Sequence, residues 1–502
     1  MNTLKTIAIT VWLSASICCA EVSHVGFDLP AIRNPATLET RVIEDWKPAP
    51  KEPAVRQKLI EITVCEWWSG QKIRLPVTLN APSSGAVCRN LIVDNMGMGL
   101  KPALPTGAAL RLLKEKGVGV VLIGTGEIAA MTPDGKLHVG MKQHLLKTRD
   151  PRFTPAWLWG ISHMRALTAA MVESDVFQPA KVLATGGSKR GMAAIAAGIH
   201  DDRFTAIVPI VASPFGSPSG PYVLGTGSPE VSQANERFFA DLAAGRRPGM
   251  PDTAAAALKD RQKRQADVRI TVGEARHAGW SAGDITDMNE RAWDTIRVTS
   301  HLDALRRRGF ELFYIVGSND NANPWLVELG QRHPDFPIYI VPGGQHGGPT
   351  TTGFTLQVPT LPATQENLQV FARHHFFGTP KLPAAPRMER RLDPATRRLA
   401  VTVVFPDGAE PEDNKLWWSV NRHPPASLPF EYDPWQSMAL RKIAPGTYAG
   451  EATYPHDART IDFVSTHRHL ADGSSFRVSS AMQKVETGPA SADVPAAQSG
   501  AR

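Results

Sequence analysis

The sequence lacks the features that mark several specialised classes of protein. It has four cysteines in 502 residues, and none of them stands in the spacing of a zinc site or a redox motif. It has no phosphate-binding glycine loop and no cluster of metal-ligating side chains, so we expect no cofactor and no metal. Beyond the N-terminus no apolar run is long enough to cross a membrane, so we expect no transmembrane segment in the mature chain.

The charge is basic, but it is not organised for a nucleic acid. The net charge is +7, and the basic residues lie in short scattered clusters such as 306–308, without interleaved aromatic side chains. Such clusters are typical of solvated helix faces, so no nucleic-acid partner is predicted. The composition is 42% hydrophobic and 21% charged, as in globular proteins, and the length indicates one large domain and a smaller one. The oligomeric state is left open.

The first twenty residues resemble a secretory signal peptide. Lys5 precedes an apolar stretch from Ile7 to Ile17, and small residues follow up to Ala20, where cleavage is expected. The pattern predicts a secreted or periplasmic protein. A lipid anchor on one of the cysteines before Ala20 is the alternative, but it fits less well because a large residue would stand where a small one is needed.

Two cysteines, Cys65 and Cys88, remain after cleavage of the signal. In an oxidising compartment they can form one disulfide if their Cα atoms lie about 4.4–6.8 Å apart. The alternative is a pair of buried free thiols. The sequence does not decide between the two.

Short, continuous apolar runs alternate with helical patterns over most of the chain. An antiparallel hairpin (59–68 and 72–82) is followed by apolar runs at 90–95, 117–124, 181–187, 204–211, 310–318 and 336–344. Runs of this kind are typical of strands buried on both faces. The sequence therefore predicts an α/β-hydrolase-type domain over 21–385, with a mostly parallel sheet between helices.

Four further segments depart from that alternation. Residues 216–292, rich in glycine, proline and charge, fall between two sheet strands and predict a cap insertion over the carboxyl ends of the strands. Short alternating runs over 386–484 predict an Ig-like β-sandwich. The polar residues 21–58 are expected to cross the surface in extended form, and 485–502 to be a disordered tail.

The stretch "KVLATGGSKRGMAAIAAGI" places Ser188 where a strand turns into a helix. A serine hydroxyl is a poor nucleophile, and a tight turn lets a base and a substrate carbonyl reach it. The following helix offers backbone N–H groups to an oxyanion. The motif departs from G-x-S-x-G, because Arg190 occupies the place of the second glycine and the glycine stands at Gly191. A capping serine in a plain glycine-rich turn is the alternative.

An acid and a histidine follow the serine in the order that this kind of site requires. Asp320 comes after one apolar run, in "GSNDNANP", and His346 after the next, in "GGQHGG". We predict that His346 lies within hydrogen-bond reach of Ser188 and that Asp320 meets the other ring nitrogen. The weaker candidates are His163, His200 and His333 as bases, and Asp303 and Asp335 as acids.

The oxyanion would need two backbone donors. We expect one from the N–H of Lys189, directly after the serine, and a second from Met96 or Gly97, in the glycine-containing loop "NMGMG" after an earlier strand. The side chains of Lys189 and Arg190 could hold an anionic substrate or pair structurally with the cap. We favour the structural role.

Together these motifs carry a resemblance to a known family. Gly-x-Ser-Lys-Arg-Gly after a strand, the later Gly-x-x-Asp and Gly-x-His loops and a C-terminal sandwich with tryptophans are similar to the PhoPQ-activated pathogenicity-related family of exported α/β-hydrolase proteins. The resemblance is diffuse over about residues 60 to 480 and sharpest around Ser188. It implies a Ser-Asp-His site and leaves the natural substrate open.

These observations favour a secreted serine hydrolase that cleaves carboxylic esters, on a small molecule or on a polymer. Ser188 would attack the carbonyl, His346 would move the proton, and Asp320 would orient the imidazole. Two alternatives stay open: a non-catalytic exported binding protein on the same fold, and a serine peptidase.

Overall fold

The computed structural model describes residues 26–96, 99–124, 136–216, 223–224, 229–244, 270–346, 357–471 and 473–488. The expected signal peptide, 1–20, lies outside these ranges, and so does most of the expected tail. The start of that tail is ordered, however, because strand β21 (Gln483–Glu486) pairs with the sandwich strand β19 (Thr460–Ala471). The prediction of disorder from 485 is therefore wrong at its beginning. None of the described helices is long and apolar enough to span a membrane.

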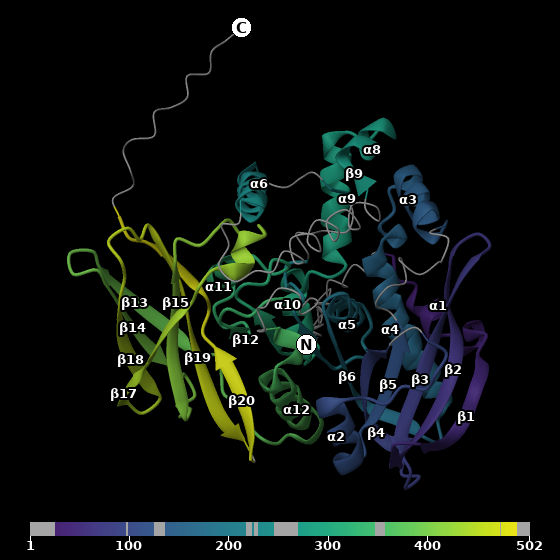
Figure 1. The fold of residues 1–502 in the computed structure, drawn as a ribbon. Helices are drawn as coiled ribbons and strands as arrows, with labels where there is room; N and C mark the ends of the chain where they lie inside the picture. The colour runs from purple at the N-terminus through teal and green to yellow at the C-terminus, as the bar shows by residue number, and fades with distance from the viewer. Residues whose placement is uncertain are drawn as a thin grey trace, which may run out of the picture.

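One large, mostly parallel sheet organises the N-terminal three quarters of the chain (Figure 1). Its strands follow the spatial order β1-β2-β3-β5-β4-β6-β7-β11-β12, with the short β10 beside β7. The bounds are β1 Arg41–Ala49, β2 Glu52–Trp68, β3 Gln71–Pro82, β4 Cys88–Met96, β5 Gly119–Gly124, β6 Phe177–Gly187, β7 Ala206–Ile210, β10 Glu311–Leu312, β11 Tyr314–Gly317 and β12 Ile338–Val341. Strands β5, β4, β6, β7, β11 and β12 run parallel to one another, whereas β1, β2 and β3 form an antiparallel edge.

The predicted hairpin and parallel sheet are confirmed, and the sheet gains one strand that was not expected. Residues 41–49 form β1 and pair with β2, rather than crossing the surface as isolated extended chain. This strand was not predicted because residues 41–58 contain many charged residues and prolines. An edge strand tolerates them, since it needs only one buried face.

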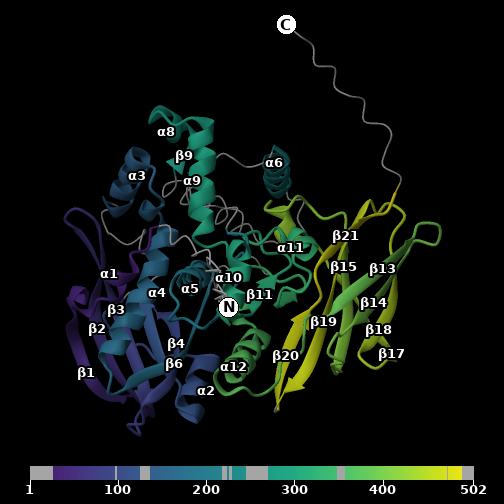
Figure 2. The ribbon, with the colours of Figure 1, turned by 180° about the vertical axis from the view of Figure 1, so that it is seen from behind.

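Helices cover both faces of the sheet, as Figures 1 and 2 show. Alternate residues of β4 separate the two cores: Leu91 and Val93 face α4 and α5, whereas Ile92 faces α2 and α12. The described helices are α1 Leu29–Arg33, α2 Gly107–Lys116, α3 Lys136–Thr148, α4 Pro155–Val172, α5 Lys189–His200, α6 Pro229–Ala243, α8 Val272–His277, α9 Ala282–Asp294, α10 Leu302–Arg307, α11 Leu326–Arg332 and α12 Pro362–Phe377.

The described parts of the cap segment are the helices α6, α8 and α9 and a two-stranded parallel sheet of β8 (Val223–Leu224) and β9 (Ile270–Thr271). Helices α8 and α9 begin with capping boxes, in which Thr271 and Ser281 exchange hydrogen bonds with Glu274 and Asp284. Both helices stand beside α3 beyond one end of the sheet (Figure 2) and are held there by ion pairs such as Arg149–Asp284 at 2.5 Å. Residues 245–269 of the expected cap lie outside the described residues.

The C-terminal strands form two antiparallel sheets, β13-β14-β18-β17 and β16-β15-β19-β20, with β21 beside β19. Their bounds are β13 Arg387–Asp393, β14 Arg398–Val404, β15 Asp413–Val420, β16 Gln436–Ala439, β17 Arg441–Ala444, β18 Thr447–Thr453 and β20 Ser474–Ser479. The core between them is continuous with the α2/α12 face of the large sheet. Phe313 joins the two, with its ring centroid 4.9 Å from Phe476 and 5.9 Å from Phe371.

The two cysteines are free thiols, so the disulfide does not form. Cys65 lies on β2 and Cys88 on β4, and strands β3 and β5 stand between these two in the sheet. Three strand spacings of about 4.8 Å each far exceed the reach of a disulfide. Burial raises the pKa of the Cys65 thiol to about 12 and that of Cys88 to about 11.

Candidate active site

Three parallel strands end at one edge of the large sheet, and each is followed by one polar residue predicted from the sequence. Ser188 follows β6, Asp320 follows β11, and His346 lies in the loop after β12. Because the carboxyl ends of parallel strands share an edge, residues more than 130 positions apart in sequence meet here. Strand β6, which contains Lys181–Gly187, is a central strand between β4 and β7, as predicted.

Ser188 occupies a strained turn between β6 and α5. Its φ of 59° and ψ of −125° lie outside the regions that residues with a Cβ normally adopt. The backbone N–H of Ser188 donates to Ile210 O at 2.8 Å, which fixes the turn against β7. Such strain persists only where the surroundings impose it, and here it lifts the hydroxyl off the strand end.

Two glycines make this turn sterically possible. Gly186 has φ +151°, and a Cβ there would stand 2.8 Å from the Cβ of Arg190. A Cβ at Gly191 would stand 2.9 Å from Gly186 O and 2.8 Å from the Cβ of Ala212. The close approach of helix to strand therefore falls at Gly191, one residue later than in G-x-S-x-G, and Arg190 points away from it as an exposed side chain.

Asp320 is fully buried in a turn that satisfies its carboxylate. We call residues 318–323 the acid turn. Within it, one carboxylate oxygen accepts from the backbone N–H of Ala322 at 2.8 Å, and the other accepts from Asn323 Nδ2 at 2.6 Å. These bonds fix the orientation of the carboxylate, so that Oδ1, the oxygen bonded to Ala322, also faces His346.

The three side chains form a continuous hydrogen-bonded chain. His346 Nδ1 lies 2.9 Å from Asp320 Oδ1, and His346 Nε2 lies 2.7 Å from Ser188 Oγ. A buried carboxylate accepts only, so it selects the tautomer with the proton on Nδ1. Nε2 is then the acceptor for the Ser188 hydroxyl proton, which is the position that a general base requires.

The weaker candidates lie elsewhere. Burial of His163 inside α4 lowers its pKa to about 4, and His200 Nε2 lies 3.1 Å from Thr295 O. His333 follows α11 and packs near the ring of Phe215. Asp303 and Asp335 are exposed and pair with Arg306 and Arg387.

Lys189 is the first residue of α5, so its backbone N–H belongs to the end of the helix that favours negative charge. Met96 is buried at the end of β4, where its sulfur lies 3.2 Å from Thr78 Oγ1. Gly97, the other predicted donor, lies outside the part of the chain that the structure describes. The pair of oxyanion donors stays a prediction.

A second carboxyl group lies at this edge and was not predicted from the sequence. Asp94, near the end of β4, accepts from the backbone N–H and the side-chain Nδ2 of Asn95, both at 2.8 Å. Burial raises the pKa of Asp94 to about 6, although those bonds and the charge of Arg190 act against the rise. Its position directly after an apolar run was the available signal.

The contact between the sandwich and this edge was not predicted from the sequence either. The connection between β15 and β16, residues 421–435, lies against the acid turn and the loop that carries His346. The side-chain amide of Asn319 donates to two backbone carbonyls of this connection, Glu431 O and Asp433 O. Nothing in the local sequence shows that contact, because the partners are more than 100 residues apart.

The sheet order and the positions of Ser188, Asp320 and His346 after the parallel strands β6, β11 and β12 define an α/β-hydrolase fold. Residues 141–215 match the family model of the PhoPQ-activated pathogenicity-related protein, so the resemblance inferred from the sequence is confirmed over this segment. No curated protein matches the chain.

Solved structures with similar folds include three hydrolases. An acetyl xylan esterase from Paenibacillus sp. R4 is 13% identical, with 69% of this chain and 92% of that chain covered and a TM-score of 0.41. A glucuronoyl esterase from Solibacter usitatus is 14% identical, with the same coverage and a TM-score of 0.38. A puromycin-hydrolysing peptidase of Mycobacterium tuberculosis is 15% identical, with 64% and 40% covered and a TM-score of 0.33.

Proposed function

We propose that the protein is an exported serine hydrolase that cleaves carboxylic esters through Ser188, His346 and Asp320. The observation that carries the proposal is the pair of distances, 2.7 Å from Ser188 Oγ to His346 Nε2 and 2.9 Å from His346 Nδ1 to Asp320 Oδ1. A strained serine, a correctly oriented imidazole and a buried carboxylate together make up a nucleophile with its base.

In the proposed reaction Ser188 Oγ bonds to the ester carbonyl carbon, and His346 Nε2 takes the hydroxyl proton of Ser188. Asp320 stabilises the imidazolium and does not take the proton itself. His346 then donates that proton to the leaving alcohol as the C–O bond of the ester breaks. A water molecule, deprotonated by His346, then attacks the acyl carbon. The bond between that carbon and Ser188 Oγ breaks, the acid leaves, and His346 returns the proton to Ser188 Oγ.

The negative charge that develops on the carbonyl oxygen needs donors in fixed positions. The N–H of Lys189, at the start of a helix of 12 residues, is one proposed donor, and Met96 or Gly97 would supply the second. Removing one such donor in other enzymes reduces kcat about 10²- to 10³-fold. The structure of α5 supports the first donor because the helix begins directly after the nucleophile.

The decisive experiment is covalent labelling with a fluorophosphonate probe on the full chain. We expect labelling of the wild type and none in Ser188→Ala. Ser84→Ala, which removes an exposed hydroxyl from the turn between β3 and β4, is the matched control and should label like the wild type. Equal labelling of wild type and Ser188→Ala would overturn the proposal, and a complete lack of labelling would favour a binding protein.

A substrate panel then separates esters from amides. Paired esters and anilides of the same acyl group should show turnover of the esters at rates at least about tenfold above the anilides, since an alcohol leaves more easily than an amine. Acetyl and longer acyl groups, on small alcohols and on polysaccharides, would define the acyl and alcohol preference. Faster turnover of the anilides would make the protein a peptidase.

A further inference from the structure

The sandwich connection 421–435, which we call the clamp segment, reaches the proposed catalytic residues through buried polar groups. Its central residue is Arg422, whose side chain is 4% exposed. The Arg422 guanidinium donates from Nη2 to Ser318 O at 2.7 Å and to Asn319 Oδ1 at 3.1 Å. Both acceptors belong to the acid turn, directly before Asp320.

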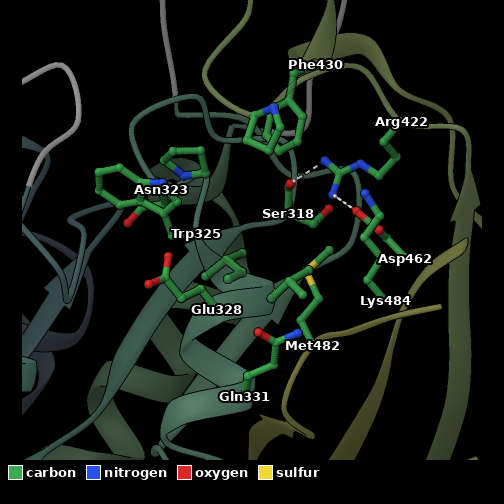
Figure 3. A pocket seen from close by; sticks show the side chains of 14 residues that line it. Ser318, Asn323, Trp325, Glu328, Gln331, Arg422, Phe430, Asp462, Met482 and Lys484 are labelled. Carbon is green, nitrogen blue, oxygen red and sulfur yellow. Dashed lines mark hydrogen bonds and ion pairs between the residues drawn. The ribbon is translucent and has the colours of Figure 1, made fainter. Parts of the chain in front are cut away.

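Aromatic rings and carboxylates hold Arg422 in place from the sandwich side. Figure 3 shows the guanidinium between Ser318 and Asp462, with Phe430 close to it. Its central carbon lies 4.0 Å from the ring centroid of Phe430, Nη1 lies 3.3 Å from Asp462, and Nε lies 3.5 Å from Asp433. A buried arginine needs such partners, and its planar fork fixes the direction of every bond.

Asn319 receives further bonds from the clamp segment. Its Oδ1 accepts from Trp435 Nε1 at 2.7 Å, and its Nδ2 donates to Asp433 O at 2.8 Å. Both ends of the amide are therefore used on the sandwich. The residue next to the proposed catalytic acid is fixed by another domain.

The histidine loop, residues 342–346, is held by the same segment. Gln345 Nε2 donates to Glu431 O at 2.8 Å, one residue before His346. The histidine loop and the acid turn are also joined directly, by Asn319 N to Gly344 O at 2.9 Å and Gly343 N to Ser318 Oγ at 2.8 Å. One sandwich segment thus binds both loops on which the His346–Asp320 distance depends.

The clamp segment touches the cap as well. Asn235 of α6 accepts from the backbone N–H of Leu428 at 2.7 Å, and Phe238 stacks on Tyr432 with centroids 5.7 Å apart. These contacts place the clamp segment between the cap helix and the two loops. They give the sandwich a path to the site that does not pass through the large sheet.

We infer that Arg422, acting through Asn319, is a positioning residue, and that the clamp segment holds Asp320 and His346 in their catalytic geometry. This inference rests on the proposed function of the Ser-His-Asp site. A misplacement of about 1 Å in a reacting group can reduce the rate about 10²-fold, so these bonds are expected to act on kcat. Substrate binding depends on other groups, and KM should change little.

The test uses three variants of the full chain, each chosen to remove donors while keeping bulk. Arg422→Lys keeps the charge beside Asp433 and Asp462 but loses the fork. Trp435→Phe keeps an aromatic ring beside the Arg422 guanidinium and loses the indole N–H. Gln345→Met keeps the length of the side chain and loses its amide. We expect kcat to fall about 10²-fold in Arg422→Lys and about tenfold in the other two, with KM within about twofold.

Arg477→Met is the matched control. Arg477 of the sandwich pairs with Glu366 of α12 at 2.6 Å, so it joins the same two domains without touching the acid turn or the histidine loop. It should lower the melting temperature as much as Trp435→Phe while leaving kcat within about twofold of the wild type. An equal loss of kcat in Arg477→Met would mean that the clamp segment only holds the two domains together, and it would overturn the inference.

A spectroscopic measurement separates this inference from the proposed function. In the Ser188→Ala background, the hydrogen-bonded Nδ1 proton of His346 should give a far-downfield ¹H NMR resonance, assigned by its loss in His346→Gln. Arg422→Lys should shift or broaden it, whereas Arg477→Met should not. An unchanged resonance in folded Arg422→Lys and Gln345→Met would overturn the inference. Ester turnover that survives Ser188→Ala would overturn the proposed function, whereas the resonance would still report whether the clamp segment positions His346 and Asp320.

Discussion

The large sheet and the C-terminal sandwich are both built mainly from strands, yet they contribute to the site in different ways. In the sheet β6, β11 and β12 run parallel, so their following turns gather Ser188, Asp320 and His346 at one edge. In the sandwich the strands alternate in direction, and successive turns fall at opposite edges. Its contacts with the site come from one long connection instead. Topology brings Ser188, Asp320 and His346 together, and in our proposal one connection of the sandwich fixes the distances between them.

The largest expected effect tests the sheet edge. His346→Ala should reduce ester turnover by at least about 10⁴-fold, because Ser188 loses its base. The melting temperature should stay close to that of the wild type, since His346 contributes a loop side chain rather than core packing. Steady-state kinetics and thermal unfolding would check both, with the exposed His456→Ala as the matched control. Turnover retained in His346→Ala would give the role of base to another group.

The second prediction tests whether sheet and sandwich form one cooperative unit. Phe476 is 1% exposed and packs on Phe313 between them, so Phe476→Ala should lower the free energy of unfolding by about 3–5 kcal/mol. Because the core is continuous, both regions should still unfold in a single transition in urea. Phe377→Ala, at a ring that is 42% exposed, should lower it by less than about 1 kcal/mol. Two separate transitions in the wild type would contradict a shared core.

The third prediction concerns buried histidines of the sandwich. Burial lowers the pKa of His467 to about 3 and that of His469 to about 4. Below the ordinary histidine pKa of about 6.5, these two histidines bind protons in the unfolded chain but not in the folded chain. Stability is therefore complete above about pH 6.5 and should fall by about 1–3 kcal/mol per histidine as the pH drops toward 4.

Chemical unfolding followed between about pH 7 and 4.5 would measure that slope. His469→Gln should flatten it, whereas His456→Gln, at an exposed position, should leave it unchanged. A slope that is the same in all three proteins would show that the acid sensitivity comes from other groups.

The smallest expected effect returns to the edge of the sheet. The raised pKa of Asp94, about 6, means that the folded protein binds a proton more tightly than the unfolded chain does. Its stabilising contribution is complete below about pH 4 and is lost as the pH rises through 6. Asp94→Asn should therefore raise the free energy of unfolding at pH 7 by about 1–2 kcal/mol, and the gain should vanish near pH 4. A gain that is independent of pH would mean that the substitution acts through packing.

Much of this architecture could be predicted from local patterns. The period of the apolar residues predicts the parallel strands, because a strand covered on both faces has no polar side to display. The turn chemistry around Ser188 likewise depends on neighbours in sequence, and the chain order of serine, acid and histidine can be read without knowing the fold. Strand β1 and the ordered residues after 484 were missed, because edge strands are polar on one face and resemble loops.

The sequence by itself determined which residues we propose as nucleophile, base and acid, since Ser188, His346 and Asp320 are marked by residue type and by position after a strand. Only the tertiary structure decided the strand order, which separates Cys65 from Cys88 and leaves both as thiols. It also decided that Arg422 lies against Ser318 and Asn319, across more than 100 residues of chain. Pairings at that separation depend on how whole domains pack, and no local period or turn motif encodes them.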